Sequence, residues 1–306
     1  MEIDRTAMIE QVLKNWDLWY PQITGQFHAD SPRLTFRIHT RLQDYILKGQ
    51  PCSVLENTVK SNVNAHLFLG NQHQMAPRLY PTKTGACYIS DHGYWFYLVE
   101  FIDGRQMEET TEDEYKIGQA ARKLHSLQGY DVKSPAPQSK ARFYTWFRDR
   151  SFVKEYDAIL NEIPDFEKLD RCFVHTDIGP HNTVLRQDGK VMFIDLDDAG
   201  IGSRYLDIGW PFIMQFVHFD HGTGKMDYRF DLAQSFLRGY FGEREISREA
   251  YDLIFYGAMQ MHISYMQSYG PDAVEDLWKI LLFGMAQKEP LWELVRKQKG
   301  KRKCDP

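Results

Sequence analysis

The sequence predicts an α+β fold in two lobes, a small and mainly β N-terminal lobe followed by a larger helical C-terminal lobe. Strand-like runs rich in β-branched and aromatic residues concentrate in the first third of the chain. Beyond about residue 110, apolar residues recur at helical spacing in one segment after another. The length of 306 residues fits one bilobal unit or two ordinary domains. We place the lobes at residues 1–102 and 103–306.

The composition is that of a globular protein, with 43% hydrophobic, 14% aromatic and 26% charged residues. A net charge of -5 argues against a general nucleic-acid binder, because a surface that follows phosphates needs excess Lys and Arg. No apolar run approaches the roughly 20 residues that cross a bilayer, so no membrane partner is expected. The N-terminus lacks the basic start and apolar run of a signal peptide, which predicts a cytoplasmic protein. The four cysteines are scattered without a C-x-x-C pair, which favours reduced thiols and no structural zinc.

The first lobe is predicted to alternate helices with strands. Residues 6–20 place five apolar side chains at helical spacing, namely Ile9, Val12, Leu13, Trp16 and Trp19. Strands are predicted at residues 34–39, 44–48, 86–90 and 95–102. A helix is predicted at residues 53–69, between the second and third of these strands.

The second lobe is predicted to be a succession of helices. A capping-box pattern at Thr110–Glu114 begins a helix that runs to Leu127. A second helix is predicted at residues 143–160, with Trp146 and Phe147 as core candidates. Four more helices are predicted at residues 205–219, 229–241, 249–269 and 273–287. The basic tail at 296–303 is expected to be a frayed, solvated end.

The residues that carry chemistry concentrate between Phe173 and Ala199. His175, Asp177 and Asn182 fit the spacing H-x-D-x-x-x-x-N, in which the Asp orients or deprotonates an acceptor hydroxyl and the Asn binds magnesium. Residues 183–186 and 190–193 flank Gln-Asp-Gly, which predicts a hairpin. Asp195 follows the second apolar run, where a strand tip would present a metal ligand. A single H-x-D match arises often by chance, but the ordered combination favours a site.

A lysine in the first lobe fits the same chemistry. Lys48 ends an apolar strand ahead of a helix, which is where kinases place the amine that contacts the α- and β-phosphates. The alternative is an edge-strand lysine that points into water. We favour the functional interpretation because the motif downstream needs such a residue.

On these residues the chain resembles the superfamily of aminoglycoside phosphotransferases and choline kinases, small-molecule enzymes with a protein-kinase-like fold. The matching segments are HTDIGPHN, IDLDDAG and the run Arg204-Tyr-Leu-Asp207-Ile. The resemblance implies that Asp177 is the catalytic aspartate, that Asn182 and Asp195 are magnesium ligands, and that Asp207 is a structural carboxylate. The resemblance to this superfamily covers most of the chain. Two positions depart from the usual pattern: Thr176 replaces a glycine and Leu196 replaces an aromatic residue.

The resemblance also places a hinge that holds adenine at Glu100 to Gly104, mainly through backbone groups. The segment that should cover the phosphates, residues 23–31, has a single glycine. Kinase chemistry requires a Glu in the helix after Lys48, yet its one acid is Glu56, and the usual position falls nearer Asn64. The partner of Lys48 is therefore left open.

Two histidines in the motif receive structural interpretations. By resemblance, His175 is expected to be a buried hydrogen-bonding residue that shapes the loop. His181 is interpreted as a loop side chain and not as a ligand.

The expected function is transfer of the γ-phosphoryl group of ATP, with Mg²⁺, to a hydroxyl of a small molecule. No A-P-E segment follows the motif and little room for an activation loop exists between Asp198 and Asp207, which disfavours a protein kinase. Aminoglycoside, amino alcohol, homoserine-like and sugar acceptors all stay open. The alternative is a binding or structural protein with a kinase fold and weak or lost turnover, such as a spore-coat-associated member of the superfamily. The oligomeric state is left open.

Aromatic residues in the last third of the chain are the candidates for the acceptor pocket. We name Trp210, Tyr256, Tyr265 and Trp278, which could bind a cationic amine or a sugar face. The alternative for each of them is ordinary core packing.

Overall fold

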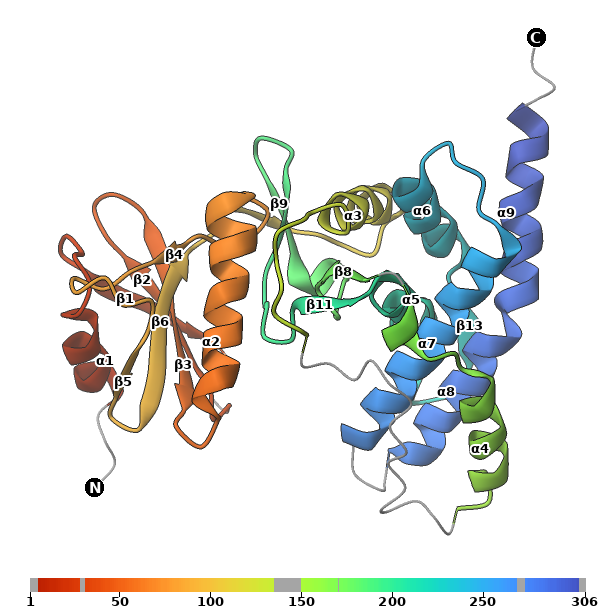
Figure 1. The fold of residues 1–306 in the computed structure, drawn as a ribbon, viewed down its shortest axis with the longest axis horizontal. Coiled ribbons are helices and arrows are strands. Elements are labelled where there is room, and N and C mark those ends of the chain that lie inside the picture. The colour runs from red at the N-terminus through yellow and green to blue at the C-terminus, as the bar shows by residue number, and fades with distance from the viewer. Residues whose placement is uncertain (1–4, 28–30, 135–149, 170, 269–272, 303–306) are drawn as a thin grey trace. The chain divides into compact units, whose positions relative to one another are not determined.

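The chain folds into two compact units in the computed structural model, which describes residues 5–27, 31–134, 150–169, 171–268 and 273–302. The first unit comprises residues 1–105 together with 184–199. The second comprises residues 106–183 and 200–306. The chain is mixed α+β, with its main sheet in the N-terminal part and helices dominating the C-terminal part (Figure 1), as the sequence predicts.

The first unit is built on an antiparallel sheet. Its strands follow the order β1-β2-β3-β6-β4, with β5 also paired to β6. Their bounds are β1 (Gln22–Phe27), β2 (Leu34–His39), β3 (Asp44–Pro51), β4 (Leu79–Tyr80), β5 (Ile89–Asp91) and β6 (Tyr94–Glu100).

Side chains of β6 point alternately to the two faces of this sheet. Phe96 and Leu98 join the core beneath α1 (Arg5–Leu13), whereas Tyr97 and Val99 join the core beneath α2 (Glu56–Ala65). Figure 1 shows these helices on opposite sides of the sheet. Because Lys48 is paired in register with Tyr97, it belongs to the α2 face.

Both predicted helices of this unit differ in length from the structure. The first ends at Leu13, so Trp19 lies outside it and is 61% exposed. The prediction of Trp19 as part of an apolar helical face is therefore wrong. The second helix begins at Glu56 and continues into a π-helical segment, η1 (His66–Gln72).

The hairpin predicted in the motif region is confirmed. Strands β9 (Thr183–Arg186) and β10 (Val191–Phe193) pair, and β7 (Gly104–Gln106) extends them into a three-stranded sheet. Gly189 has φ 81°, a left-handed conformation that suits glycine in a tight turn. The Gly189 amide donates to the Arg186 carbonyl, which closes the turn.

The second unit is mainly helical. Its helices are α3 (Thr111–Leu124), α4 (Val153–Glu162), α5 (Arg204–Met214), α6 (Phe230–Phe241), α7 (Arg248–Ser268), α8 (Val274–Ala286) and α9 (Lys288–Arg302). Short helical segments are η2 (Phe166–Lys168) and η3 (Pro180–Asn182). Two antiparallel pairs join β8 (Arg171–Val174) to β11 (Gly200–Ser203) and β12 (Val217–Phe219) to β13 (Met226–Tyr228).

The helix predictions here are largely confirmed, although α3 ends at Leu124 and not Leu127, and α4 begins only at Val153. The predicted cap is present, because the Thr110 side chain accepts from the Asp113 amide. The helix predicted to reach Phe219 ends at Met214, and β12 follows. The basic tail, expected to be frayed, is helical as far as Arg302. The core candidates Trp146 and Phe147 lie outside the described residues.

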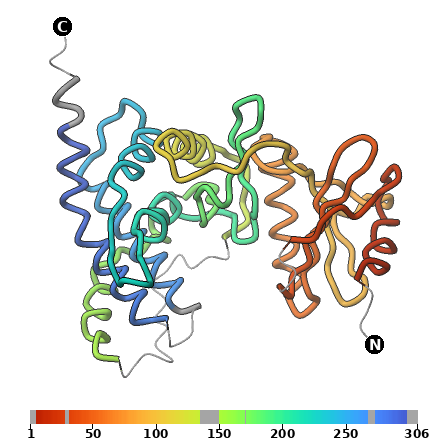
Figure 2. Tube along the Cα trace, turned by 180° about the vertical axis from the view of Figure 1, so that it is seen from behind, coloured from red at the N-terminus to blue at the C-terminus, as the bar shows by residue number. Residues whose placement is uncertain are grey.

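Paired glycines bring the helices of this unit into close contact. Gly118 of α3 lies against α6 at Gly239, and Gly209 of α5 lies against α7 at Gly257. A Cβ on Gly239 would overlap the Tyr115 carbonyl oxygen. Figures 1 and 2 show α3 beside α6, with the Cα traces close together. The backbones can approach this closely because neither helix carries a side chain at the crossing.

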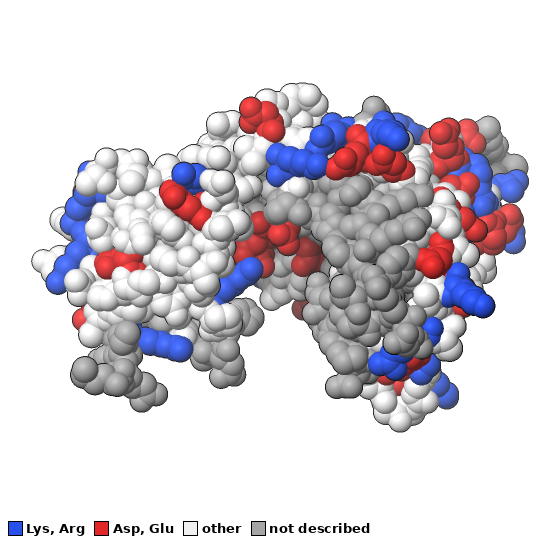
Figure 3. Space-filling model, turned by 60° about the horizontal axis from the view of Figure 1, so that its bottom comes forward, with Lys and Arg blue, Asp and Glu red and all other residues white. Residues whose placement is uncertain are grey.

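The surface carries charges of both signs. On the face drawn in Figure 3, basic and acidic side chains lie next to one another, as expected for a chain of net charge -5. Within the described ranges, no helix combines the length and apolar character needed to span a membrane.

Substitution of Gly239 by Ala should destabilise the second unit by about 1–3 kcal/mol, because overpacking forces the backbone of α6 away from Tyr115. Urea denaturation followed by circular dichroism measures this change. Gly25→Ala is the matched control, since a Cβ there meets its nearest atom at 3.9 Å. Equal stability of the two variants would contradict the close-packing argument.

Candidate functional site

Lys48 lies on β3 and points to the α2 face of the sheet. Its Nζ is 2.9 Å from Asp195 Oδ1 and 3.9 Å from Asp197 Oδ1, and its side chain is 20% exposed. Burial opposes the charge on Lys48, but Tyr97 and the two carboxylates outweigh it and hold the pKa of the lysine above its usual value. Lys48 therefore carries its charge at neutral pH, and because β3 lies between β2 and β6, it is not an edge-strand lysine that points into water.

Asp197 is a member of this cluster that the sequence argument missed. Arg33 Nη1 donates to its Oδ2 at 2.6 Å, Gln50 Nε2 to the same oxygen at 3.3 Å, and Asn62 Nδ2 to its Oδ1 at 3.2 Å. The signal that could have found it is the second acid of the IDLD segment. These donors fix Asp197 beside Lys48 while Asp195 stays 50% exposed.

The helix after Lys48 contributes an amide where kinase chemistry uses a carboxylate. Asn62 is buried and reaches Asp197, whereas Asn64 is exposed. Glu56 instead pairs with Lys60 and accepts from the Tyr88 hydroxyl. The question left open by the sequence is thereby answered for the described residues: the carboxylates beside Lys48 come from the segment after β10.

Two further buried polar side chains lie near Lys48. Burial, and then the charge of Lys48, lower the pKa of His66 to about 4, so His66 is neutral at pH 7. Its Nδ1 donates to the Pro77 carbonyl oxygen at 3.0 Å. Within the described part of the chain, His66 Nε2 and the Tyr97 hydroxyl have no hydrogen-bond partner. These groups surround the lysine with polar atoms but add no second cation.

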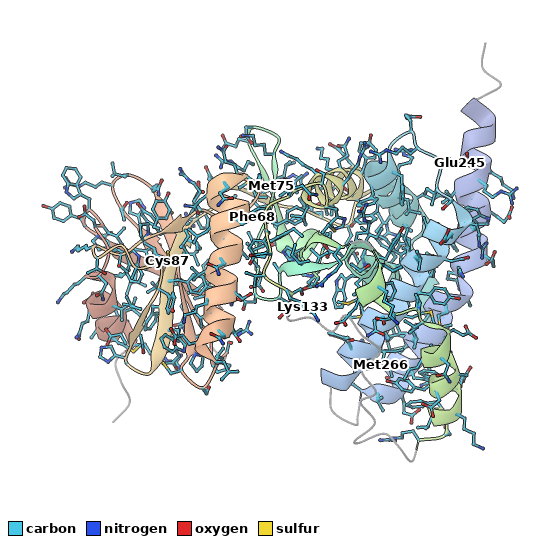
Figure 4. All side chains as sticks on the ribbon, viewed as in Figure 1. Phe68, Met75, Cys87, Lys133, Glu245 and Met266 are labelled. Atoms are coloured by element: carbon cyan, nitrogen blue, oxygen red, sulfur yellow. The ribbon has the colours of Figure 1, made fainter. Side chains whose placement is uncertain are left out.

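Asp195 follows β10 in an unusual backbone conformation. Its φ is 59°, in the left-handed region that aspartate tolerates better than most residues. The Phe193 amide donates to the Met75 carbonyl oxygen at 2.8 Å and anchors the end of the strand. Figure 4 labels Met75, together with Phe68 of η1. The turned backbone presents the Asp195 carboxylate to Lys48.

Glu100 ends β6, where the resemblance places the hinge. Its carboxylate pairs with Arg78 at 3.2 Å and lies 3.8 Å from Arg186. Its amide donates to the Arg78 carbonyl oxygen, and the Phe101 amide donates to the Asp44 carbonyl oxygen. The side chain is thus engaged within the first unit, and contact with adenine stays a prediction.

The second unit carries the loop from His175 to Asn182, which depends on one buried carboxylate. Asp207, on α5, accepts from the His175 amide at 2.7 Å and the Thr176 amide at 2.6 Å. His125 Nε2 lies 2.9 Å from the same carboxylate, and His125 Nδ1 lies 2.8 Å from the Tyr240 hydroxyl. These bonds confirm the structural role that the resemblance implies for Asp207. His125 and Tyr240 were not singled out from the sequence.

Thr176 occupies a conformation that usually belongs to glycine. Its φ is 78°, and a β-branched residue in this region costs roughly 1–2 kcal/mol. The bond from its amide to Asp207 holds it there. This strain explains why glycine is the usual residue at the position.

The Asp177 carboxylate is held at both oxygens. Oδ1 lies 3.0 Å from His181 Nε2, and Oδ2 accepts from Asn182 Nδ2 at 2.8 Å. The Asp177 amide donates to Nδ1 of His175, which is buried as expected. His181 is thus more than a loop side chain, because it contacts the predicted catalytic group. The carboxylate is 42% exposed and so can receive a ligand.

The four aromatic candidates separate into different environments. Trp210 and Tyr265 form an edge-to-face pair at 5.9 Å and are both partly exposed. Tyr256 lies under the Lys288 ammonium. Trp278 is 5% exposed and stacks on Phe152 at 4.8 Å, a core position. An acceptor role is therefore better supported for the first pair than for Trp278.

A buried acid adjoins the loop in the second unit. Glu114, on α3, is fully buried and accepts from Gln215 Nε2, while its Oε2 has no partner among the described residues. The Gln215 side-chain oxygen lies beside Gly179 of the loop. Burial first, and then nearby acids, raise the pKa of Glu114 to about 8.

Comparison with known proteins identifies the family and the fold of this chain. The model of one family, described as a phosphotransferase enzyme family, matches residues 26–248. Among solved structures, a microcompartment-associated aminopropanol kinase superposes with a TM-score of 0.64 at 14% identity, covering 94% of this chain and 98% of the other. A choline kinase from Streptococcus pneumoniae gives 0.62 at 14% identity, covering 92% and 98%. A spectinomycin phosphotransferase in complex with ADP and spectinomycin gives 0.53 at 14% identity, covering 95% and 99%.

The pKa of Glu114 predicts a pH dependence of stability. A carboxyl with an ordinary pKa of 4.5 in the unfolded chain and about 8 in the folded chain binds more protons when folded, so stability falls as pH rises between these values. Glu114→Gln keeps an acceptor for Gln215 and should flatten this slope. Urea unfolding at several pH values across this window measures it. Glu112→Gln, on the exposed side of α3, is the control and should leave the slope unchanged.

Proposed function

Because this chain belongs to the phosphotransferase enzyme family, we propose that it is a kinase that transfers the γ-phosphoryl group of ATP to a hydroxyl of a small molecule, with Mg²⁺ as cofactor. The observation that carries the proposal is the Asp177 carboxylate, fixed at both oxygens and exposed to ligand in a loop of kinase spacing. The cluster of Lys48 with Asp195 and Asp197 supplies the second half of the chemistry.

The lysine cluster suits the phosphates of a nucleotide. A phosphate oxygen would replace Asp195 Oδ1 as the partner of the Lys48 ammonium, which is an exchange of one anion for another. Asp197 would keep Lys48 oriented, because three other donors hold it in place. Lys48 therefore binds and orients the nucleotide in the proposed mechanism.

The proposed magnesium ligands have the right donor chemistry. Magnesium prefers hard oxygen ligands, and Asp195 offers a half-exposed carboxylate. The Asn182 amide nitrogen is used by Asp177, so its Oδ1 is the atom that a cation would contact. The ion would supply charge neutralisation at the phosphate oxygens.

Asp177 positions the acceptor and takes its proton. The acceptor oxygen forms a bond to the γ-phosphorus, the bond to the bridging oxygen of ADP breaks, and the hydroxyl proton passes to the Asp177 carboxylate. His181 and Asn182 restrict rotation of that carboxylate. The buried Asp207 keeps the loop backbone in place during this step.

We favour a small hydroxylated amine as the acceptor. The comparison structures include kinases named for aminopropanol, choline and ethanolamine. The faces of Trp210 and Tyr265 could attract an ammonium group through cation–π contact. A panel of amino alcohols, aminoglycosides, homoserine and sugars, assayed for ATP consumption, would identify the acceptor class.

A second candidate is a kinase-fold binding protein with weak or lost turnover. Asn62 favours it, because a kinase normally has a Glu on this helix to pair with the lysine. The discriminating measurement combines thermal shift with ATP consumption, with and without magnesium. Stabilisation by magnesium and ATP without turnover of any acceptor would favour this candidate.

Asp177→Asn should lower turnover by about 10²–10⁴-fold, because it removes the proton acceptor while preserving the shape of the side chain. Binding of magnesium and ATP, measured by calorimetry, should change little. Asp188→Asn, in the exposed β9–β10 turn, is the matched control and should retain turnover. Activity of Asp177→Asn at the wild-type rate would remove Asp177 from the mechanism.

Trp210→Ala should raise KM for the acceptor by about tenfold while sparing the response to magnesium and ATP, since one cation–π contact is worth about 1 kcal/mol or more when desolvated. Steady-state kinetics on the best acceptor of the panel measures the effect. Trp278→Phe serves as the comparison, because it preserves the stacked core and should leave acceptor KM unchanged. If Trp278→Phe raised KM for the acceptor and Trp210→Ala did not, Trp278 and not Trp210 would contact the acceptor.

A further inference from the structure

The helical unit contains a cavity that the proposed reaction does not use. Its volume is about 770 Å³, and it is lined by one side of α3, the first turns of α5, the end of α6 and the segments that follow α3 and α6. Cavities of this size hold metabolite-sized ligands. None of Asp177, Trp210 or Tyr265 is among its lining residues. It is therefore distinct from the residues proposed above for catalysis and acceptor binding.

The cavity wall is strongly basic. Arg122, Lys123, Arg204 and Arg244 line it, and no Asp or Glu is among the described residues that do so. Of these cations, Arg122, Lys123 and Arg204 form no ion pair with any carboxylate in the described part of the chain. Over the face in Figure 3, by contrast, charges of both signs are interspersed. Figure 4 labels Glu245, which follows Arg244 in the segment between α6 and α7 but is not in the wall.

Helix electrostatics account for some of these cations but not for Arg204. Arg122 and Lys123 lie in the last turn of α3, where positive charge is favourable without any ligand. Arg204 is the first residue of α5, where a positive charge faces the positive end of the helix. Its Nε is buried and has no hydrogen-bond partner among the described residues. An anion bound at the exposed part of this guanidinium group would offset the unfavourable charge.

The wall also offers donors suited to phosphate. Tyr115 and Tyr205 are among the residues that line the cavity, and each carries a hydroxyl that can donate. A Cβ on Gly242, whose φ is 61°, would lie 3.0 Å from Arg122 Nη1, so the glycine leaves room for this arginine at the cavity. Guanidinium groups bind phosphate oxygens in pairs, with more directional contact than an ammonium gives.

We propose that this cavity binds a small phosphorylated molecule, at a site separate from the nucleotide and acceptor sites proposed above. Tyr240 lines the cavity, and its hydroxyl is hydrogen-bonded to His125, which in turn contacts Asp207. A ligand there would touch the same chain of bonds that holds the His175–Asn182 loop. The inference concerns binding and stands whether or not the proposed phosphoryl transfer is confirmed.

Pyrophosphate is a suitable probe, titrated into the full chain by calorimetry in magnesium-free buffer, with chloride keeping the ionic strength constant. The double variant Arg122→Gln with Lys123→Gln should bind it about tenfold more weakly or worse, because two charge-assisted contacts are lost. Arg244→Gln alone should also weaken it. Circular dichroism of the unliganded variants checks that the helices persist.

Two controls test whether the loss of affinity is specific to this cavity. Lys168→Gln with Lys279→Gln removes the same charge from exposed positions of the same unit, and should leave pyrophosphate affinity within about twofold. Lys48→Ala, which removes the proposed nucleotide-binding lysine, should weaken the response to magnesium and ATP but retain the pyrophosphate binding that the Arg122→Gln with Lys123→Gln variant loses. The proposal would be overturned if the Lys168→Gln with Lys279→Gln control lost as much pyrophosphate affinity as the Arg122→Gln with Lys123→Gln variant. It would also be overturned if Lys48→Ala lost pyrophosphate affinity and the arginine variants did not.

Discussion

The buried carboxylate of Asp207 is the interaction on which the helical unit depends. It accepts hydrogen bonds from two backbone amides of the loop and contacts His125, so one side chain on α5 fixes the backbone of His175 and Thr176 directly after β8. A buried carboxylate without such donors would be costly, and the loop amides without such an acceptor would be unsatisfied. The strained φ of Thr176 persists because these bonds hold it. Packing of α5 on α7 through Gly209 and Gly257 keeps the carboxylate at this depth.

In the first unit, the ammonium group of Lys48 lies on the face of the sheet that α2 covers. Side chains of β3 and β6 point alternately to the two faces of the sheet. One face is apolar and packs against α1, and Lys48 and Tyr97 lie on the opposite face. Asp195 and Asp197 balance the charge, and the donors on Asp197 come from β3, from α2 and from Arg33. The glutamate of α2, Glu56, pairs with Lys60 and not with Lys48, and carboxylates from a later segment of the chain take its place beside Lys48.

Sequence reasoning recovered the fold class, the β9–β10 hairpin and most helices, because periodicity and turn residues are local signals. It also identified Asp207, through the resemblance, and Lys48, through its place at the end of a strand. It missed Asp197, His125 and Tyr240, because their importance arises from partners 82 to 164 residues away in the chain. The first helix was predicted too long for a similar reason. Trp19 fits the helical period, but the tertiary structure does not bury its side chain. The roles of Asp177, Asn182 and Asp195 stay predictions that the geometry supports.

The division of the chain has a consequence for how this protein can be taken apart. Residues 184–199 group with residues 1–105, although 78 residues of the other unit intervene between them. A truncation after residue 105 would retain Lys48 and discard both of its counter-ions, Asp195 and Asp197. Neither unit is formed by one continuous segment of the chain, so exchange of a single segment cannot transfer a whole unit. A chimaera with a related kinase therefore needs at least three junctions, and the hairpin has to travel with the N-terminal segment.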